Sequence, residues 1–339
     1  MLAAFVDVSG VVLRDVAEPE AGRGEIVVRM GVCGVCGTDL EKAHGRGITQ
    51  AVLGHEVAGT VVETGEDVSD IEEGDRVYVH HHVSCGKCFY CLNGSPTMCH
   101  LFKTTNIYPG GFSELFKVSQ PIVERGGVVN IGGMGFEEAS FIEPLACCLR
   151  SLERAGFRPG MSAAVLGFGP AGALHAMALR ASGSPYVVVA DVSSYRLEYA
   201  YRVGVDEAVN LREQDLSTVS RRGTDGRGVD YVVVATGNPE ALKTALDVVR
   251  PGGRICLFGA PPRSSTVEME LPKIFLNEIS IIPNYSTTEK ETREAFHLIK
   301  AGLVKPSILV SHRYRLADVV EAFKTASNPS ASMKVVVHP

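Results

Sequence analysis

The chain has 339 residues, of which 45% are hydrophobic and 21% are charged, and its net charge is −6. This length predicts two domains, because single hydrophobic cores rarely grow beyond about 250–300 residues. No apolar run approaches the roughly 20 residues of a membrane span, and the basic residues are not clustered as nucleic-acid binding would require. We therefore expect a protein that binds small molecules and copies of itself, and neither nucleic acid nor membrane. Its 9 cysteines are too few for a disulfide scaffold, which favours a reducing cytoplasm.

The first part of the chain reads as a β-rich domain. Short alternating runs at 25–30 and 59–63 predict antiparallel strands joined by glycine turns. Helical spacing over 145–155 and a Pro-Gly turn then mark a new domain. We place the first domain at 1–145, the second at 146–284, and assign 285–339 to a segment that returns to complete the first.

The middle of the chain alternates apolar runs with amphipathic segments. The runs lie near 163–166, 187–190, 231–234 and 254–258. Runs of this kind, separated by helices, are typical of a parallel sheet that is buried on both faces. The second domain is therefore predicted to be a doubly wound α/β domain of the Rossmann type.

A glycine-rich turn follows the first of these strands. It reads Gly167-Phe168-Gly169-Pro170-Ala171-Gly172 and opens a helix, which is the context that dinucleotide binding requires. Gly167 permits a tight turn, Gly169 lets the backbone approach a pyrophosphate, and Gly172 allows close packing of helix on sheet. Pro170 and Ala171 place the helix N-terminus beside the phosphates. The alternative is an ordinary glycine turn.

Asp191 ends the next apolar strand, 19 residues beyond Gly172. A carboxylate there accepts hydrogen bonds from adenosine ribose and repels a 2′-phosphate, which favours NAD over NADP. A cap at the strand-to-helix turn is the alternative for Asp191. Arg196 leaves NADP open, since a guanidinium can accommodate the extra phosphate.

Four cysteines lie close together in a lobe at about 80–105: Cys85, Cys88, Cys91 and Cys99. Four thiolates at this spacing can hold one tetrahedral zinc ion and leave no open position, so the site is predicted to be structural. Two disulfides or an iron–sulfur cluster are the alternatives. The preceding triplet, residues 80–82, cannot share one ion, because consecutive strand residues point to opposite faces, so at most one or two of its histidines contribute to a pocket. Surface histidines are the favoured interpretation.

A second metal site is suggested by side chains that are far apart in the sequence. The candidates are Cys36, the pair His55 and Glu56, and Glu143. One cysteine, one histidine and one carboxylate, with water in the fourth position, would make a catalytic zinc centre. Taken singly, Cys36 could be a buried thiol, His55 a core histidine, and Glu143 a carboxylate at a helix N-terminus.

Together these motifs resemble the zinc-containing medium-chain dehydrogenase/reductase family over essentially the whole chain. The similarity is greatest to the sorbitol, threonine and polyol dehydrogenase branch, where a Glu-Pro-Leu segment like that at 143–145 replaces a cysteine ligand. The resemblance implies an amino-terminal GroES-like domain with a Rossmann domain inserted before the carboxyl terminus. It also implies two zinc ions per chain and a homodimer or homotetramer.

The resemblance assigns roles to single residues. Cys36, His55 and Glu143 correspond to the ligands of the catalytic zinc, and Glu56 to a neighbouring or exchangeable ligand. Thr38 aligns with the hydroxyl residue that begins a proton relay. The next relay residue, usually histidine, is Glu41 here, so Glu41, His44 or bulk water could take the proton.

The implied reaction is hydride transfer between nicotinamide and a secondary alcohol, polyol or sugar-like substrate. Zinc would lower the pKa of the substrate hydroxyl, and Thr38 would take up its proton. A zinc-free NADPH quinone or enone reductase of the same architecture is the main alternative, and it would leave Cys36, His55 and Glu143 without a role. A nucleic-acid-binding zinc ribbon would explain only the four-cysteine lobe, which lacks interleaved basic and aromatic residues.

Overall fold

The structure is a computed structural model, and it describes residues 1–8, 10–44 and 52–339. Its contacts divide the chain into two compact units. The first unit contains residues 1–146, 286–328 and 334–339, and the second contains residues 147–285 and 329–333. Each unit is described by itself below.

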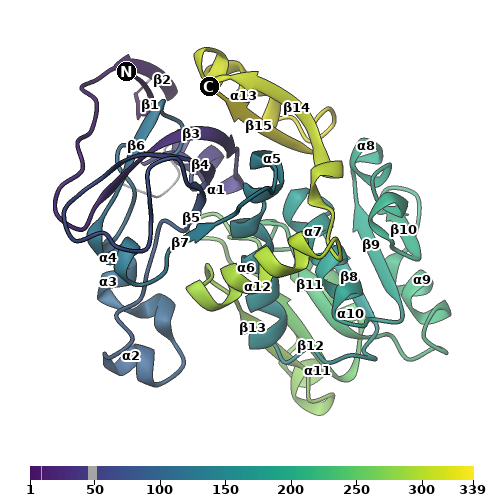
Figure 1. The fold of residues 1–339 in the computed structure, drawn as a ribbon. Helices are drawn as coiled ribbons and strands as arrows, with labels where there is room; N and C mark the ends of the chain where they lie inside the picture. Colours follow the sequence, from purple (N-terminus) through teal and green to yellow (C-terminus); the bar gives the residue numbers. More distant parts are fainter. Residues whose placement is uncertain (9, 45–51) are drawn as a thin grey trace. The chain divides into compact units, whose positions relative to one another are not determined.

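The first unit is built on an antiparallel-rich sheet of order β14-β15-β3-β4-β5-β7, with β6 pairing to β3 and a separate hairpin of β1 and β2 (Figure 1). Its strands are β1 (Leu2–Asp7), β2 (Gly10–Asp15), β3 (Ile26–Gly34), β4 (Glu56–Thr64), β5 (Arg76–Val79), β6 (Leu115–Val118), β7 (Val128–Asn130), β14 (Val310–Arg315) and β15 (Lys334–His338).

Short helices connect these strands. They are α1 (Gly37–Ala43), α2 (Phe89–Leu92), η1 (Pro96–Met98), α3 (His100–Thr104), α4 (Gln120–Glu124), α5 (Phe136–Ala139), α12 (Glu289–Lys300), η3 (Pro306–Leu309), η4 (Leu316–Asp318) and α13 (Val319–Ala326). Helix α6 (Ile142–Arg154) runs from the first unit into the second. The core between these elements is rich in valine, as in β3 and β4, because β-branched side chains suit a pleated, buried surface.

The end of the chain is part of the first unit's sheet. Strand β15 pairs in parallel with β14 and antiparallel with β3, where Val336 lies opposite Gly34 and Val337 opposite Cys33 (Figure 1). The predicted terminal strand is therefore present, and it places Lys334 beside the end of β3.

The second unit is a six-stranded parallel sheet of order β10-β9-β8-β11-β12-β13. Its strands are β8 (Ala163–Leu166), β9 (Val187–Asp191), β10 (Glu207–Asn210), β11 (Val229–Val234), β12 (Val249–Leu257) and β13 (Ser280–Pro283). Its helices are α7 (Pro170–Ala181), α8 (Ser194–Leu197), η2 (Tyr201–Val203), α9 (Leu216–Arg222), α10 (Ala241–Val248) and α11 (Leu271–Leu276).

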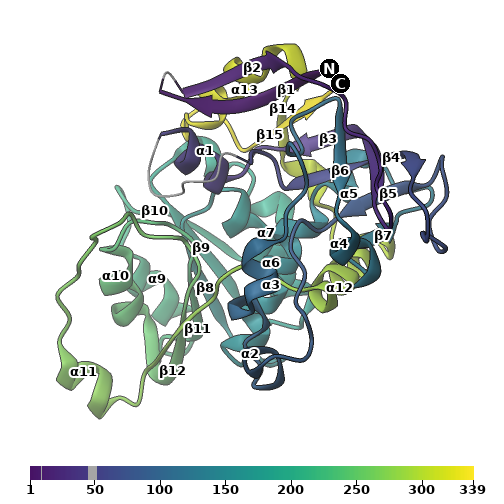
Figure 2. The same ribbon diagram turned by 90° about the vertical axis from the view of Figure 1, so that its left-hand side faces the viewer.

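Helices cover both faces of this sheet: Figure 2 shows α7 on one side and α9 and α10 on the other. Every residue of β8 and β9 is buried, which explains their continuous apolar sequence. The order in which strands are added to the sheet reverses at β8: β9 and β10 lie on one side of it, and β11, β12 and β13 on the other. In such sheets, ligands bind outside the carboxyl ends of the strands at this reversal.

The predicted fold class, a GroES-like β domain with a Rossmann sheet, is confirmed. Within the described ranges, none of the helices combines the length and the apolar character that a bilayer crossing demands.

Candidate functional site: two metal centres and a dinucleotide turn

The four cysteines of the lobe converge on one point. The Sγ atoms of Cys85, Cys88, Cys91 and Cys99 all lie within 4.8 Å of one another. The Sγ–Sγ distance is 3.9 Å between Cys85 and Cys91 and 3.5 Å between Cys88 and Cys91. Zinc–sulfur bonds of about 2.3 Å in a tetrahedron place sulfur atoms roughly 3.8 Å apart. The four side chains therefore fit a tetrahedral ion, and all four are free thiols instead of the alternative disulfides.

The backbone of the lobe favours the thiolate form that a metal requires. The amide of Cys88 donates to Sγ of Cys85 at 3.3 Å, and the amide of Cys85 donates to Sγ of Cys99 at 3.4 Å. Backbone hydrogen bonds, that of Lys87 foremost, lower the pKa of Cys85 to about 6. Such N–H···S bonds also fix the directions of the sulfur atoms, so the loop is shaped for a ligand before one binds.

A second cluster brings together Cys36, His55 and Glu56, whose ligand atoms also lie within 4.8 Å of one another. Cys36 follows β3 and caps the N-terminus of α1. His55 directly precedes β4, and Glu56 is the first residue of that strand. Because β3 and β4 are neighbours, with Gly34 opposite Glu56, their ends bring these side chains together from 20 residues apart.

Two other predicted site residues lie outside this cluster. Glu143 is buried in the first turn of α6, with 5% of its surface exposed. Its carboxylate does not belong to the group formed by Cys36, His55 and Glu56. Thr38 is exposed in the first turn of α1. The roles of Glu143 as a ligand and of Thr38 as a proton acceptor remain predictions.

Asp39, which sequence reasoning did not identify, orients the histidine of the cluster. It is fully buried, and its Oδ1 lies 3.4 Å from Nδ1 of His55. The same carboxylate accepts the amides of Cys36 at 3.2 Å and Gly54 at 3.1 Å. Burial would lower the pKa of His55, but the charge of Asp39 outweighs it and raises that pKa well above the ordinary value. Asp39 thus holds Nδ1 of the ring and leaves Nε2 for a ligand.

Glu56 has a second buried partner at the end of the chain. The Nζ atom of Lys334 forms an ion pair with the Glu56 carboxylate and donates to the carbonyl of Val35 at 3.0 Å. Both charged side chains are only 2% exposed. Burial opposes the charged lysine, but Glu56 raises its pKa above the ordinary value. A lone lysine before three valines in a buried strand is the sequence signal that could have revealed it.

The histidine triplet is not a surface feature, so that interpretation was wrong. His80 is fully buried, His81 is 9% exposed, and His82 is half-buried. The triplet lies just beyond the end of β5, where the alternation of a strand no longer applies. The ring of His81 contacts those of both His80 and His82, and it also lies 5.0 Å from the ring of His55. Burial lowers the pKa of His80 to about 3 and that of His82 to about 4.

The two candidates for the second step of a proton relay lie on α1 and at its end. Glu41 is partly buried within the helix. His44 is exposed at the C-cap, and its Nδ1 lies 2.6 Å from the carbonyl of Leu40. This contact holds the His44 ring against its own helix, and the relay roles of Glu41 and His44 stay predictions.

The glycine turn of the second unit has the geometry expected from its sequence. Gly167 has a φ of +91°, which side chains disfavour. A Cβ at Gly172 would lie 2.0 Å from the carbonyl oxygen of Gly167, so only glycine permits this approach of α7 to β8. Pro170 begins α7, and Gly169 caps it. The turn therefore leaves the N-terminus of a 12-residue helix free to receive phosphate groups.

Asp191 and Arg196 both lie beside this turn. The carboxylate of Asp191 accepts the amide of Phe168 at 2.6 Å and that of Ser193 at 2.8 Å. A Cβ on Gly169 would lie 3.2 Å from the guanidinium of Arg196. Asp191 therefore joins the glycine turn to the end of β9, and Arg196 reaches the place where the phosphates are expected.

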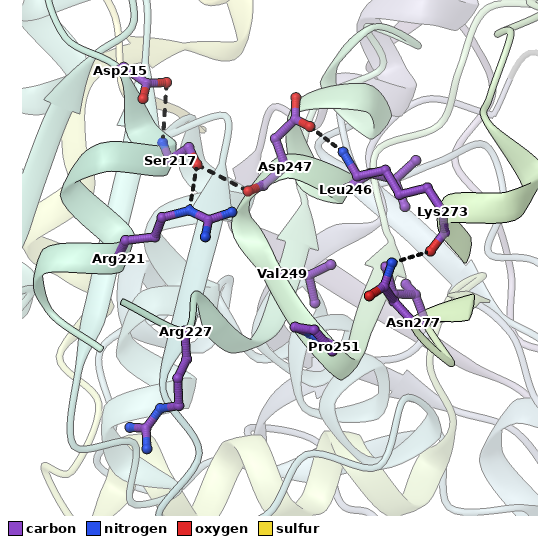
Figure 3. Close-up of a pocket in the computed structure, with 11 residues that line it drawn as sticks. Asp215, Ser217, Arg221, Arg227, Leu246, Asp247, Val249, Pro251, Lys273 and Asn277 are labelled. Carbon is purple, nitrogen blue, oxygen red and sulfur yellow. Dashed lines mark hydrogen bonds and ion pairs between the residues drawn. The ribbon is translucent and has the colours of Figure 1, made fainter. Parts of the chain in front are cut away.

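The second unit also has a pocket of about 380 Å³ between α9, α10 and α11 (Figure 3). Its charged lining residues are largely engaged with their neighbours, as in the ion pair between Lys273 and Asp247 and the bond from Arg221 to Ser217 at 3.2 Å. None of the predicted dinucleotide residues lines this pocket. It is therefore separate from the proposed coenzyme site.

Comparison with known proteins agrees with this arrangement. Residues 22–125 match the family described as alcohol dehydrogenase GroES-like domain, and residues 170–301 match the family described as zinc-binding dehydrogenase. The sorbitol dehydrogenase of Bacillus subtilis (strain 168) is 32% identical over 95% of this chain and 92% of its own. The L-threonine 3-dehydrogenase of Thermococcus kodakarensis is 31% identical over 97% of this chain and 95% of its own.

Solved structures lead to the same class. A zinc-binding dehydrogenase of Sinorhizobium meliloti 1021, bound to NADP, superimposes with a TM-score of 0.89 at 29% identity, covering 100% of this chain and 99% of that one. Together these matches define an oxidoreductase that acts on CH–OH groups with a nicotinamide coenzyme. The chain belongs to the zinc-containing medium-chain dehydrogenase/reductase family, in its polyol dehydrogenase branch.

Proposed function

We propose that this protein is a zinc-dependent dehydrogenase that transfers a hydride from a secondary alcohol, polyol or sugar-like substrate to NAD. The observation that carries the proposal is the convergence of Cys36, His55 and Glu56 within 4.8 Å of one another. A thiolate, an imidazole and a carboxylate form a donor set that suits catalytic zinc. The four-cysteine lobe, which has no open position, would hold a second, structural ion.

Zinc at the first cluster supplies Lewis-acid chemistry, which lowers the pKa of a neighbouring hydroxyl and polarises a carbonyl in the reverse direction. Cys36 and His55 would hold the ion, with the His55 ring oriented by Asp39 at 3.4 Å. Glu143 is proposed as the third ligand, in keeping with the family resemblance. Glu56, paired with Lys334, is proposed as a neighbouring or exchangeable ligand.

The proton and the hydride leave the substrate by different routes. Thr38 is exposed near the N-terminus of α1, where its hydroxyl would receive the proton of the substrate alcohol. From there the proton would pass to Glu41, His44 or water. The hydride would pass to the nicotinamide ring of a coenzyme held at the glycine turn of the second unit.

The coenzyme is proposed to bind at the glycine turn of the second unit. The backbone of Gly167, Gly169 and Gly172, with Pro170 and Ala171 at the helix N-terminus, would hold the pyrophosphate. Asp191 supports NAD, because it keeps lone pairs for the ribose hydroxyls although it already accepts two amides. The Sinorhizobium relative is bound to NADP, and Arg196 is the residue through which this chain could accept that coenzyme less favourably.

The alternative, a zinc-free NADPH quinone or enone reductase, has the same architecture but is not favoured. A zinc-free enzyme would not need Cys36, His55 and Glu56 to lie close together. Nor would it need the buried carboxylate of Asp39 to orient the ring of His55. Relatives named as sorbitol and D-arabinitol dehydrogenases also support CH–OH oxidation.

A homodimer or homotetramer in the cytoplasm is proposed as the working state. Strand β13 lies at one end of the second unit's sheet and, among the residues that the structure describes, pairs with β12 alone. An exposed strand edge of this kind can pair with a second copy of itself. The family resemblance gives the same expectation.

The experiment is a substrate panel combined with metal analysis. Purified protein would be offered polyols, sugars, amino-acid alcohols and simple secondary alcohols with NAD and with NADP, and reduced coenzyme would be followed by absorbance. We expect oxidation of at least one polyol, a higher kcat/KM with NAD, and two zinc ions per chain. Full turnover in protein that has been stripped of both ions would overturn the proposal.

A further inference from the structure

A buried histidine lies one helical turn behind the glycine turn of the second unit. Within α7, which the structure describes throughout, His175 is the one polar side chain among the buried residues, and none of its surface is exposed. An apolar side chain would fill this space without removing two ring nitrogens from water, which costs free energy. The ring must therefore make contacts that offset this cost.

Both ring nitrogens of His175 have partners. Nδ1 lies 2.8 Å from the carbonyl oxygen of Ala171, one turn earlier in α7, and Nε2 lies 2.8 Å from Oγ of Ser151 on α6. The ring of Phe258 packs edge-on against the histidine, with the two centroids 4.4 Å apart. These three contacts fix both the position and the plane of the His175 ring.

The same contacts determine which nitrogen carries the hydrogen. Burial lowers the pKa of His175 to about 4, so the ring is neutral near pH 7 and has one N–H. A carbonyl oxygen can only accept, so Nδ1 donates to Ala171, and Nε2 accepts from the hydroxyl of Ser151. That hydroxyl also lies 2.7 Å from the carbonyl of Cys148. His175 is thus held as a donor to a carbonyl in the first turn of α7.

The carbonyl of Ala171 belongs to the same peptide unit as the N–H of Gly172. Gly172 is the third residue of α7, and N–H groups of a first turn have no acceptor within their own helix. They point out of the helix N-terminus, where phosphate groups bind. The Ala171 carbonyl accepts from Nδ1 of His175 and, at 3.7 Å, from Sγ of Cys148. Such additional donors polarise the peptide unit and strengthen its N–H as a donor.

We propose that His175 is a positioning residue for the coenzyme, which holds the peptide unit between Ala171 and Gly172 with its N–H toward the pyrophosphate. Ser151 acts through His175, because it keeps Nε2 an acceptor and Nδ1 the donor. This inference rests on the proposed function and deepens it, since it names residues that shape the coenzyme turn without touching the coenzyme.

The test measures the binding of ADP-ribose by isothermal titration calorimetry. This probe carries the pyrophosphate but no nicotinamide, so its binding does not depend on turnover. His175→Leu removes both nitrogens, and His175→Asn keeps an amide N–H near the place of Nδ1. An asparagine amide can reach the carbonyl four residues earlier, as that of Asn93 does to Phe89 at 2.8 Å.

Two further variants separate positioning from stability. Ser151→Ala removes the partner of Nε2, and it keeps the test available if His175→Leu does not fold. Met177→Ala, at a buried apolar position of the same helix, is the matched control. Thermal unfolding of every variant is measured beside its affinity for ADP-ribose.

We expect His175→Leu to weaken ADP-ribose binding by about fivefold, the effect of one hydrogen bond, and His175→Asn to recover most of this loss. Ser151→Ala should weaken binding less, and Met177→Ala should lower stability without changing affinity. In turnover assays of His175→Leu, the KM for NAD should rise while kcat at saturating NAD does not fall.

Unchanged affinity in the folded variants of His175 and Ser151, or an equal loss in Met177→Ala, would overturn the role of His175. If the wild-type protein bound no ADP-ribose, the proposed coenzyme site itself would fail, which is a distinguishable result.

Discussion

The two candidate metal clusters of the first unit are built in different ways. The lobe takes all four of its cysteines from residues 85–99, and backbone N–H···S bonds orient their sulfur atoms. The cluster around Cys36 takes its members from the ends of β3 and β4, and further buried charges from α1 and β15 surround it. A single local loop is enough to bind an ion whose role is to stabilise the fold. A centre that performs chemistry needs side chains fixed from several directions, and its supporting residues are scattered along the chain.

The largest effect is expected from Cys36→Ala. Loss of this thiolate removes one of the proposed zinc ligands, and metal polarisation is worth several kcal/mol, so kcat should fall by about a thousandfold or more. NADH binding, followed by fluorescence titration, should stay close to that of the wild type because the proposed coenzyme residues belong to the other unit. Cys147→Ala, a half-buried cysteine outside both clusters, is the matched control. Full activity of Cys36→Ala would refute the assignment.

Lys334→Met should destabilise the protein by about 3–5 kcal/mol, because the carboxylate of Glu56 would remain buried without its partner. Urea unfolding followed by circular dichroism measures this effect. The double variant Lys334→Met with Glu56→Gln removes the orphaned charge and should recover much of the loss. The exposed Lys324→Met is a control that should change stability little. Equal destabilisation by Lys334→Met and Lys324→Met would contradict the importance of the buried pair.

Cys91→Ser tests whether the lobe contributes to stability and not to catalysis. We expect the zinc content to drop from two ions to one per chain and the stability to fall by roughly 2 kcal/mol or more, since a structural metal site is lost. Turnover per folded molecule should remain within about threefold of the wild type, in contrast to Cys36→Ala. Atomic emission analysis and a thermal scan give the first two quantities. Loss of turnover while one ion is still bound at the Cys36 cluster would show that the lobe contributes to catalysis.

The smallest effect concerns Glu137, which ties α5 to the last strands of the first unit. Its carboxylate accepts from Arg313 at 2.6 and 2.8 Å and lies 3.1 Å from Nε2 of His338. The hydrogen bond from Arg313, with its charge and that of His338, lowers the pKa of Glu137 although partial burial opposes this. Glu137→Gln should cost about 1 kcal/mol at neutral pH, because the pair is partly exposed.

The pH dependence of this effect follows from the lowered pKa. The stabilisation by Glu137 is fully present above the pKa of the unfolded chain, near 4.3, and is lost as the pH falls through the lower folded value. The difference between wild type and Glu137→Gln should therefore shrink in acid. Glu138→Gln, on the same helix, is the matched control. A difference that grew as the pH fell would contradict the ion pair.

Much of the fold was predictable, because apolar periodicity reports burial. The antiparallel strands β3 and β4, the buried strands β8, β9 and β11, and the terminal strand β15 all correspond to runs that were found in the sequence. Strands β10 and β13 were not predicted. They lie at the two edges of the parallel sheet, where their residues are only partly buried and the apolar pattern is weak.

The candidate sites could be predicted where the spacing of residues along the sequence is itself typical of a function. The four cysteines and the glycine turn are local motifs, so their geometry follows from a short segment. The roles of Asp39 and Lys334 could not be assigned from spacing, because each contacts a residue from a distant part of the chain, although the lone lysine in a buried strand is a signal that Lys334 has a buried partner. The histidine triplet was misread, since its residues follow a strand and lie within the protein interior.

Strand β15 has a consequence for biosynthesis. A ribosome releases residues 334–338 only after the second unit and the rest of the first have been made, yet this strand lies between β14 and β3 and carries the partner of Glu56. The amino-terminal unit must therefore wait, with one flank of its sheet open, while the inserted Rossmann unit can fold during translation. A nascent chain that stops a few residues early would lack the cation that neutralises the buried carboxylate of Glu56, so this part of the first unit is completed only when β15 has been made.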